Sequence, residues 1–297
     1  MRNLWIVALL GLAGLAAWGA DDGGTRGLLP EDVVKARPQA KAAAPLAKPV
    51  YRPVGNERMQ ALRAPAAAAG RQIGVTIWRL RPAGGADSGG VRLLVQDETG
   101  SAEWVPERVA AASALRSGDR VRLTIESPEA GYLYVVDRER YASGERGAPW
   151  LIFPTSRTRG GDNQVAAGKL VEIPGQEDRP NFFSLKPSRP DQVEEELTIL
   201  LAPKPIEGVE IGAKAAQIPG EMVAKWEREW GAGKTDIFEL TGGAGKAWTS
   251  AEQRAGADST RVLTQDDPPP QSIYRVVGAK AGDPILAKVQ LRYGLRK

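Results

Sequence analysis

Apolar and polar residues alternate in short stretches through the middle of this chain. Between residues 120 and 126, Val121, Leu123 and Ile125 occupy every second position, and charged residues or threonine lie between them. A period of two is typical of a β-strand with one face in the core and the other in water. This stretch therefore predicts a half-buried antiparallel strand.

A second stretch, Tyr132–Val136, is rich in the aromatic and β-branched residues that fit the packed surface of a sheet. Pro128 and Gly131 predict a turn before it, so we expect residues 120–136 to form a hairpin. Because proline cannot donate to a strand ladder, prolines between the later apolar runs mark where strands end. These runs are residues 150–153, 169–173, 181–185 and 196–202. Short strands at this close spacing are typical of an antiparallel β-sandwich or an open barrel.

The regions on either side of this core also carry patterns. Met222, Trp226 and Trp230 lie four residues apart between a proline and a glycine, which predicts a helix over residues 219–231. A short helix is expected within residues 103–115 and another at residues 249–254. Further strands are predicted at residues 73–81, 91–95, 236–240, 272–277 and 284–293. The predicted fold is mainly β.

The chain divides into four parts. Residues 1–19 have a basic start, an apolar stretch and small residues before a predicted cleavage after Gly19, as in a signal peptide. The alternative is an uncleaved anchor, but the apolar stretch is shorter than the roughly 18–20 residues that span a membrane. Residues 20–70 predict a disordered linker rich in proline, alanine and basic residues. A β-sandwich domain is predicted at residues 71–207, and an α+β extension that packs on it and completes one of its sheets at residues 208–297.

The net charge of +4 is confined to the linker. Residues 30–65 carry seven basic and three acidic residues, whereas residues 66–297 carry 31 of each kind. A basic face on the folded part is therefore not predicted, which argues against nucleic acid as a partner. The linker is either a plain spacer or a segment whose Lys and Arg side chains lie along an anionic polymer of the cell envelope.

The core also carries the motifs of a known family. In chain order these are Gly118-Asp119, Gly131-Tyr132-Leu133-Tyr134-Val135, Leu151-Ile152-Phe153-Pro154, Asn163, Ala167-Gly168, Ile173-Pro174 and residues 197–202. Together they resemble a bacterial domain family of unknown function, over roughly residues 118–203. Members of that family are found in exported proteins and appended to caspase-like peptidases and protein kinases. The resemblance implies a β-sandwich accessory module, and because the family has no established activity it supplies no catalytic residue.

The chain has no histidine and no cysteine, which excludes several chemistries. Ser-His-Asp and Cys-His catalysis, histidine- or thiolate-ligated metals and disulfides are all ruled out. Without a cysteine to carry a lipid, the protein is not a lipoprotein. Serine with lysine three residues later, as in penicillin-binding enzymes, does not occur. We expect no catalytic residue, no metal site and no cofactor.

Two glycine–lysine stretches resemble the end of a phosphate-binding loop. They are Gly233–Thr235 and Gly242–Lys246. The full motif needs a glycine five residues before the one that precedes the lysine, and Arg228 and Leu240 occupy those positions. The sequence therefore does not predict a nucleotide site.

Carboxylate clusters and other polar groups are further candidate sites. Glu194–Glu196 and Asp266–Asp267 are the obvious sources of the two acids of a glycosidase, but we expect a solvated strand start and a loop. Gly160–Asn163 offers oxygens to calcium without the further acids of a calcium loop, so it predicts a turn. Arg157 and Arg159 follow a predicted strand and are expected to be solvated, with anion binding as the alternative.

Six tryptophans lie outside the predicted signal peptide, and we expect them in the core, with carbohydrate stacking as the alternative. They are Trp78, Trp104, Trp150, Trp226, Trp230 and Trp248.

These features favour a non-enzymatic binding or scaffold module of the bacterial cell envelope, exported to the periplasm or secreted. The expected partner is a protein or a cell-envelope polymer, with no nucleic acid and no transmembrane segment after signal cleavage. Two alternatives stay open. One is an envelope hydrolase that acts through two carboxylates, as a glycosidase does. The other is a structural subunit of an envelope assembly.

Overall fold

The structure of the protein is a computed structural model. It describes residues 32–39, 49–54, 70–84, 91–97, 100–231, 233–258, 261–279 and 282–294. The predicted signal peptide, most of the predicted linker and the glycine-rich loop at residues 85–90 lie outside these residues.

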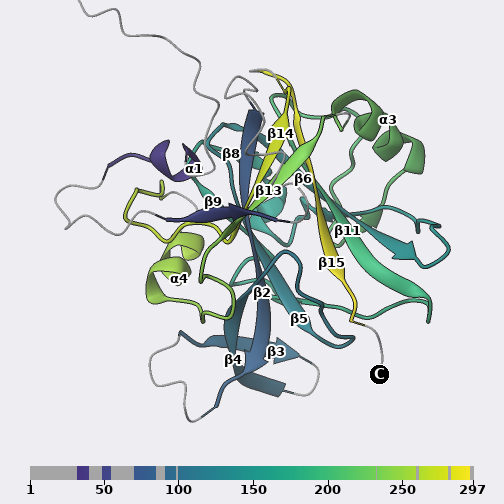
Figure 1. Cartoon of the computed structure of the whole chain (residues 1–297). Helices are drawn as coiled ribbons and strands as arrows, with labels where there is room; N and C mark the ends of the chain where they lie inside the picture. Colours follow the sequence, from purple (N-terminus) through teal and green to yellow (C-terminus); the bar gives the residue numbers. More distant parts are fainter. Residues whose placement is uncertain are drawn as a thin grey trace, which may run out of the picture.

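Two antiparallel sheets face each other across the main core (Figure 1). The first contains, in order, β1 (Tyr51–Pro53), β13 (Thr235–Leu240), β14 (Ser272–Val277), β2 (Gly70–Pro82), β4 (Gly100–Val109) and β3 (Leu93–Asp97). It also contains β5 (Arg120–Glu126), which pairs with β2, and β9 (Leu170–Ile173) and β10 (Phe183–Ser184), which pair with β5. The second contains β12 (Ala216–Gln217), β7 (Trp150–Phe153), β6 (Gly131–Tyr141), β11 (Gln192–Ala202) and β15 (Ile285–Arg292), with β8 (Gln164–Val165) also paired to β6. The prediction of a mainly β, sandwich-like fold is confirmed.

The main core forms from every second side chain of the central strands. The prediction that the other face of residues 120–126 lies in water is wrong, because Arg122, Thr124 and Glu126 are buried as well. Val121, Leu123 and Ile125 of β5 are buried from one side, and Leu197 and Ile199 of β11 are buried from the other. Apolar side chains of this size gain about 1.5–3 kcal/mol each when they leave water. Burial of these alternating rows therefore holds the two sheets together.

The predicted hairpin over residues 120–136 is wrong. β5 pairs with β2 in the first sheet, whereas β6 pairs with β11 in the second. The turn between them carries the chain across the sandwich, so both strands face the same core from opposite sides. Two alternating strands joined by a short turn can form a hairpin or can lie in opposite sheets. Here β5 pairs with β2 and β6 pairs with β11, which places them in opposite sheets.

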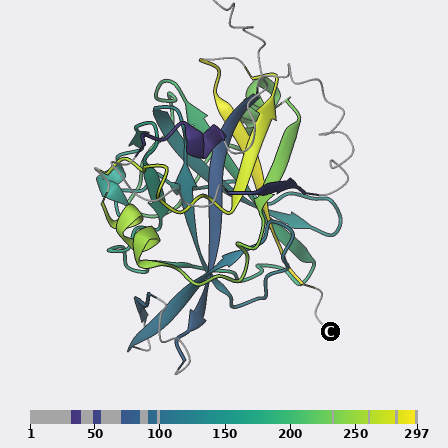
Figure 2. The same ribbon diagram turned by 60° about the vertical axis from the view of Figure 1, so that its left-hand side comes forward.

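The helix predicted within residues 103–115 is also wrong. Residues 100–109 form β4, which pairs with both β2 and β3. Pro106 is unfavourable in the interior of a helix, and Val105 and Val109 place their side chains in buried positions. Strand pairing with β2 and β3 therefore outweighs the helix propensity of the alanine-rich residues 109–115 that follow. In both ribbon views β3 and β4 project from one end of the molecule (Figure 2).

Both downstream helices are confirmed. α3 (Gly220–Trp230) buries Val223 and Trp226 against the outer face of the second sheet, where they meet Tyr134, Leu200 and Leu286. It adds a third layer to the sandwich. α4 (Ser250–Ala257) begins with a capping box between Thr249 and Glu252. Among the described residues, no helix is long and apolar enough to cross a membrane.

The C-terminal residues contribute to both sheets. β14 pairs with β2, and β13 pairs with β14 in the first sheet. β15 pairs with β11 over eight positions in the second sheet. Residues 208–297 therefore supply strands on both sides of the main core, whereas the sequence predicts one completed sheet.

Two segments of the predicted linker lie against the sandwich. α1 (Asp32–Lys35) buries Val33 against Phe238 and Ile273, and β1 pairs with β13. Arg37 follows α1 and is buried, with its guanidinium bound to Glu126 of β5. The linker is poor in large apolar residues, so its composition does not predict this docking. The docking depends instead on a few specific contacts, those of Val33, β1 and Arg37.

Candidate functional site

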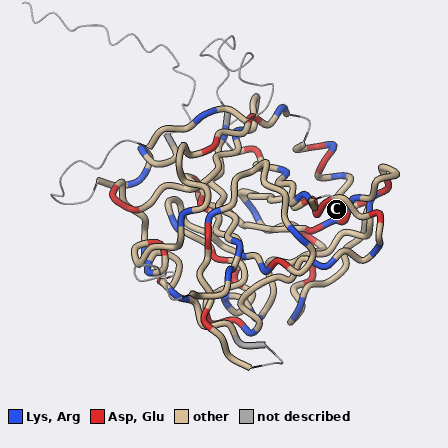
Figure 3. The backbone as a smooth tube through the Cα atoms, turned by 60° about the horizontal axis from the view of Figure 1, so that its bottom comes forward, with Lys and Arg blue, Asp and Glu red and all other residues tan. Residues whose placement is uncertain are grey.

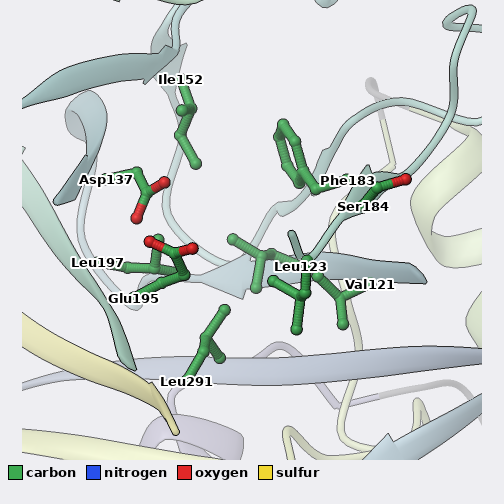
Figure 4. A pocket seen from close by; sticks show the side chains of 10 residues that line it. Val121, Leu123, Asp137, Ile152, Phe183, Ser184, Glu195, Leu197 and Leu291 are labelled. Atoms are coloured by element: carbon green, nitrogen blue, oxygen red, sulfur yellow. The ribbon is translucent and has the colours of Figure 1, made fainter. Parts of the chain in front are cut away.

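A pocket of about 140 Å³ lies between the two sheets, towards the end of β6 and the start of β11 (Figure 4). Its polar lining residues are Asp137, Glu195 and Ser184, and the Ser184 hydroxyl points away from the two acids. The remaining lining side chains are apolar, namely Val121, Leu123, Ile152, Phe183, Leu185, Leu197 and Leu291. The pocket therefore combines a large apolar surface with two acidic groups, which Figure 4 shows close together.

Strand periodicity places both acids inside the sandwich. Asp137 lies opposite Leu197 in the β6–β11 ladder, and Glu195 lies opposite Glu139. Opposed residues of an antiparallel pair share one face, so these acids are on the same face as the core residue Leu197. Along the core-facing side of β11, the apolar Leu197 is thus followed by the acidic Glu195 at the pocket.

Each of the two carboxyl groups has a buried oxygen atom without a hydrogen-bond partner. Glu195 is 7% exposed, and its Oε1 accepts hydrogen bonds from Gln192 Nε2 at 2.7 Å and from the Tyr293 hydroxyl at 2.8 Å. Its Oε2 has no partner among the described residues, and neither does Oδ1 of Asp137. Glu139 accepts a hydrogen bond from the Tyr141 hydroxyl. An unpartnered buried oxygen is costly, so these two atoms point to a ligand.

The environment favours the protonated form of both acids. Burial raises the pKa of Asp137 well above its usual range, and the negative charges of Glu195 and Glu139 raise it further. Burial also raises the pKa of Glu195, although the hydrogen bonds from Tyr293 and Gln192 act in the opposite direction. Burial and the nearby Glu195 raise the pKa of Tyr293 in turn. The pocket is therefore a site where removal of a proton is unfavourable.

The neighbouring glutamates on the other face of β11 have cationic partners. Glu194 binds Arg140 at 3.2 Å and lies 3.7 Å from Arg292. Glu196 binds Arg140, Arg146 and Lys288. By contrast, the side chains that line the pocket include no Lys or Arg. Alternate acids of one strand are thus neutralised outside the sandwich and left without a cation inside it.

The expectation that Glu194–Glu196 is a solvated strand start is wrong, because all three side chains are buried in β11. The physical reason is the long ladder with β6 and β15, which covers both edges of this stretch. Asp266–Asp267 lies in a turn, as expected, and Asp267 accepts hydrogen bonds from Arg261 and from the backbone N–H of Thr264.

The stretch Gly160–Asn163 contains the end of a single 3-10 turn, η2 (Arg159–Gly161), followed by Asp162 in an extended conformation, in line with the predicted turn. Asp162 lies 3.4 Å from Arg159, and Asn163 donates a hydrogen bond to the backbone of Leu133. Arg157 is exposed and lies near a backbone oxygen of Arg179. Among the described residues no group of three or more His, Cys, Asp or Glu is placed to hold a metal ion.

Three tryptophans lie in apolar clusters, as expected of core residues. They are Trp78, Trp226 and Trp248, each at most 3% exposed. Trp104 and Trp230 are partly buried against the same clusters. Trp150 is exposed on β7, so the expectation of a core position is wrong for this residue. Trp226 and Trp230, both on α3, stack on each other, so their rings contribute to packing.

The two glycine–lysine stretches have structural roles. A Cβ at Gly233 would lie 2.8 Å from the backbone oxygen of Val277, so this glycine allows close approach of two chain segments. Lys234 forms an ion pair with Asp236 at 3.1 Å. Gly242–Lys246 lies in a turn after β13, where Gly242 and Gly245 have positive φ angles.

Sequence reasoning missed Asp137 and misread Glu195, although the signal was present. Asp137 falls on the same alternate positions of β6 as Leu133 and Val135, and Glu195 falls on those of Leu197. An acid in the inward row of a strand is either buried with a partner or placed at an opening of the core. Basic and acidic residues are otherwise interspersed along the described chain (Figure 3).

Comparisons with known proteins bear on one part of the chain. A search of curated proteins and a search of solved structures each gave no match. A comparison with protein-family models covers β5 to β11 and includes both Asp137 and Glu195. Residues 114–205 match the family model described as Domain of unknown function (DUF4384), which confirms the resemblance found in the sequence.

Proposed function

We propose that this protein is a non-enzymatic binding module of the bacterial cell envelope, which takes a small group of its partner into the pocket between the sheets. The observation that carries the proposal is the pair of buried carboxyl oxygens without partners, Asp137 Oδ1 and Glu195 Oε2, beside an apolar-walled pocket. A ligand that donates hydrogen bonds there would remove the cost of leaving them unpaired. The partner is a protein or an envelope polymer. A side chain or an end group of this partner enters the pocket.

Export is the second part of the proposal. Its support is the signal-like sequence of residues 1–19, with a cysteine-free chain that needs no disulfides. Fractionation of cells that make the full chain, followed by mass spectrometry of the N-terminus, tests this. We expect the chain outside the cytoplasm and beginning at residue 20. Recovery of an intact chain from the cytoplasm alone would refute export.

A pocket-dependent crosslinking experiment tests the binding function. Ser184 is exposed and lines the pocket, so a photoreactive amino acid at this position reports what enters it. The matched control is the same amino acid at the exposed position of Lys204, which does not line the pocket. In intact cells we expect adducts from position 184 that disappear in the Asp137→Asn, Glu195→Gln double variant. Adducts that persist unchanged in that variant would exclude the pocket as the binding site.

A carboxylate-dependent hydrolase is the second candidate, because a protonated acid beside a second carboxyl group is what general acid catalysis needs. The geometry favours it less. Asp137 and Glu195 come from neighbouring strands of one sheet and face an apolar wall, whereas a glycosidase places its acids about 5 to 10 Å apart with the sugar between them. Cleavage of the captured partner by the wild type, and its loss in Asp137→Asn, would establish the hydrolase.

A further inference from the structure

We infer that the pocket between the sheets binds a primary ammonium group on an unbranched apolar stem, as in the side chain of a lysine from a partner protein. This inference rests on the proposed binding function and specifies the chemistry of the ligand. The pocket contributes two hydrogen-bond acceptors, Asp137 Oδ1 and Glu195 Oε2, which have no partner. Its remaining wall is apolar except for Ser184.

The charges of the surrounding groups select a cation. Asp137, Glu139 and Glu195 share one face, and the groups bound to their side chains are Tyr141, Tyr293 and Gln192, all uncharged donors. No salt bridge to these three acids occurs among the described residues. An anion would find no cationic partner on this face, and a neutral apolar ligand would leave both orphan oxygens unpaired. A cation with N–H donors satisfies both requirements.

The placement of the two free oxygens favours an ammonium over a guanidinium group as the ligand. A guanidinium is a planar fork that fits both oxygens of one carboxylate, as Arg37 fits Glu126 elsewhere in this protein. Here the two free oxygens belong to different carboxyl groups. An ammonium is compact and has three donors that rotate together, so it can bind two separate acceptors. A lysine therefore matches this arrangement better than an arginine does.

The volume and the apolar wall account for the stem. A cavity of about 150 Å³ accommodates a benzene molecule, so the pocket of about 140 Å³ holds a group of similar size. Four methylene groups and an ammonium fill that space. Val121, Leu123 and Phe183 approach from the first sheet, opposite the two acids. They would contact the methylene stem while the ammonium reaches Asp137 and Glu195.

Binding of a cation couples to release of a proton. The titratable groups that face Asp137 are Glu195 of β11, Glu139 of β6 and Tyr293 after β15. Burial and the charges of Glu195 and Glu139 favour its protonated form, although the backbone N–H of Arg138 opposes this. A bound ammonium favours the ionised form instead, so its affinity increases as pH rises through the titration of Asp137. It declines again only near the pKa of the amine, about 10.4 for lysine.

Calorimetric titration of the full chain with n-butylammonium chloride tests the inference. We expect saturable binding at one site, at least tenfold tighter than binding of n-butanol or butyrate, which have similar stems and no positive charge. Nα-acetyl-lysine amide should bind as well, since it presents the same group on a peptide. Titration at one pH in buffers of different ionisation enthalpy should show proton release on binding.

Two sets of variants keep the test independent of folding. Asp137→Asn with Glu195→Gln should weaken butylammonium binding at least tenfold. Ile152→Lys places an ammonium on a half-buried residue whose side chain points towards Asp137 in Figure 4, so this ammonium should occupy the site and block binding. Lys204→Gln, at an exposed position outside the pocket, is the control and should bind like the wild type.

Equal affinity for butylammonium and butanol, or no loss of affinity in the Asp137→Asn, Glu195→Gln variant, would overturn the inference. Its failure is distinguishable from that of the proposed function. If butylammonium does not bind but pocket-dependent adducts still form from position 184, the ligand class is wrong and the binding function stands. If those adducts are also absent, both are wrong.

Discussion

Arg37 and Glu126 form a buried, two-point ion pair that attaches the N-terminal segment to the sandwich. Arg37 Nε lies 2.7 Å from Oε1 of Glu126, and its Nη2 lies 2.6 Å from Oε2, with each side chain 1% exposed. Arg37 Nη1 also donates to the backbone oxygen of Asp267 at 2.8 Å. A residue of the predicted linker, a sheet residue and the segment before β14 therefore meet at one point.

Removal of Arg37 should strongly destabilise the fold. Loss of one partner of a buried ion pair leaves an uncompensated charge and typically costs about 3–5 kcal/mol. We expect Arg37→Met to lower the free energy of unfolding by that amount in urea denaturation. Arg52→Met is the matched control, since Arg52 is exposed on β1, and should change it by less than about 1 kcal/mol.

A second substitution separates charge from packing at this position. Replacement of both partners of a buried ion pair by apolar residues is often close to neutral. Glu126→Met in the Arg37→Met background should therefore recover most of the lost stability. If the double variant is as unstable as Arg37→Met, the contribution of Arg37 comes from its backbone hydrogen bonds and not from its pairing with Glu126.

The pocket acids predict an unusual pH dependence. The pKa of Asp137 is higher in the folded state than in the unfolded state, where it is about 3.9. The folded state therefore binds the proton more tightly, and the stability from Asp137 is lost as pH rises from about 4 through the raised pKa. An asparagine side chain at this position does not titrate. The stability of Asp137→Asn relative to the wild type should increase over that range, as measured by urea denaturation at a series of pH values.

Glu227 provides a control of opposite sign. Burial opposes its ionisation, but hydrogen bonds from Arg146 and Lys288 outweigh burial and lower its pKa to about 2. Its contribution to stability is present above the unfolded pKa of about 4.3 and is lost as pH falls towards 2. Glu227→Gln should therefore be less stable than the wild type at neutral pH and approach it in acid. If both variants show the same sign, the environment assigned to Asp137 is incorrect.

The layer formed by α3 depends on one tryptophan. Trp226 is 2% exposed and packs beside Tyr134, whereas Trp150 on β7 is 45% exposed. Truncation of a buried aromatic residue costs about 3–5 kcal/mol. We expect Trp226→Ala to lower the free energy of unfolding by about that amount, and Trp150→Ala by about 1 kcal/mol or less. Similar losses for the two variants would mean that α3 does not cover the second sheet as described.

Strand bounds were predicted well where an apolar run is bounded by glycine or proline. The bounds expected for residues 120–126, 150–153 and 272–277 are those of β5, β7 and β14. In each case glycine or proline lies near the ends and the run between them is rich in apolar residues. Pairing partners were harder to predict, since β5 and β6 separate into different sheets although only a short turn joins them.

The candidate site shows the same limit. The sequence indicates that Glu195 shares the inward row of Leu197, but an inward acid is a pocket residue only where the opposing sheet leaves space. That space depends on Phe183 and Leu291, which reach it from other strands. The Arg37–Glu126 pair joins residues 89 positions apart in the chain. No periodic pattern relates such positions, and the composition around Arg37 predicts a free linker.

The segment that matches the family should not fold by itself. Residues 114–205 include β5 and β11 with their partners β9, β10 and β6, but β2, which pairs with β5, and β15, which pairs with β11, lie outside. Those missing strands also bury Ile73, Val75, Ala287 and Val289 in the main core. Without them, one face of the retained sheet residues would be exposed to water, and their burial is the main source of stability.

We therefore expect a chain of residues 114–205 to lack a cooperative thermal transition by circular dichroism, and to show poorly dispersed amide signals by nuclear magnetic resonance. A chain of residues 32–297, which contains every described strand, should show a cooperative transition and well-dispersed amide signals. A chain of residues 70–297 keeps all the strands except β1 but lacks Arg37. It should fold with reduced stability, because Glu126 is then buried without its partner. Cooperative unfolding of residues 114–205 alone would show that the matched segment is an independent domain and that β2 and β15 are additions to it.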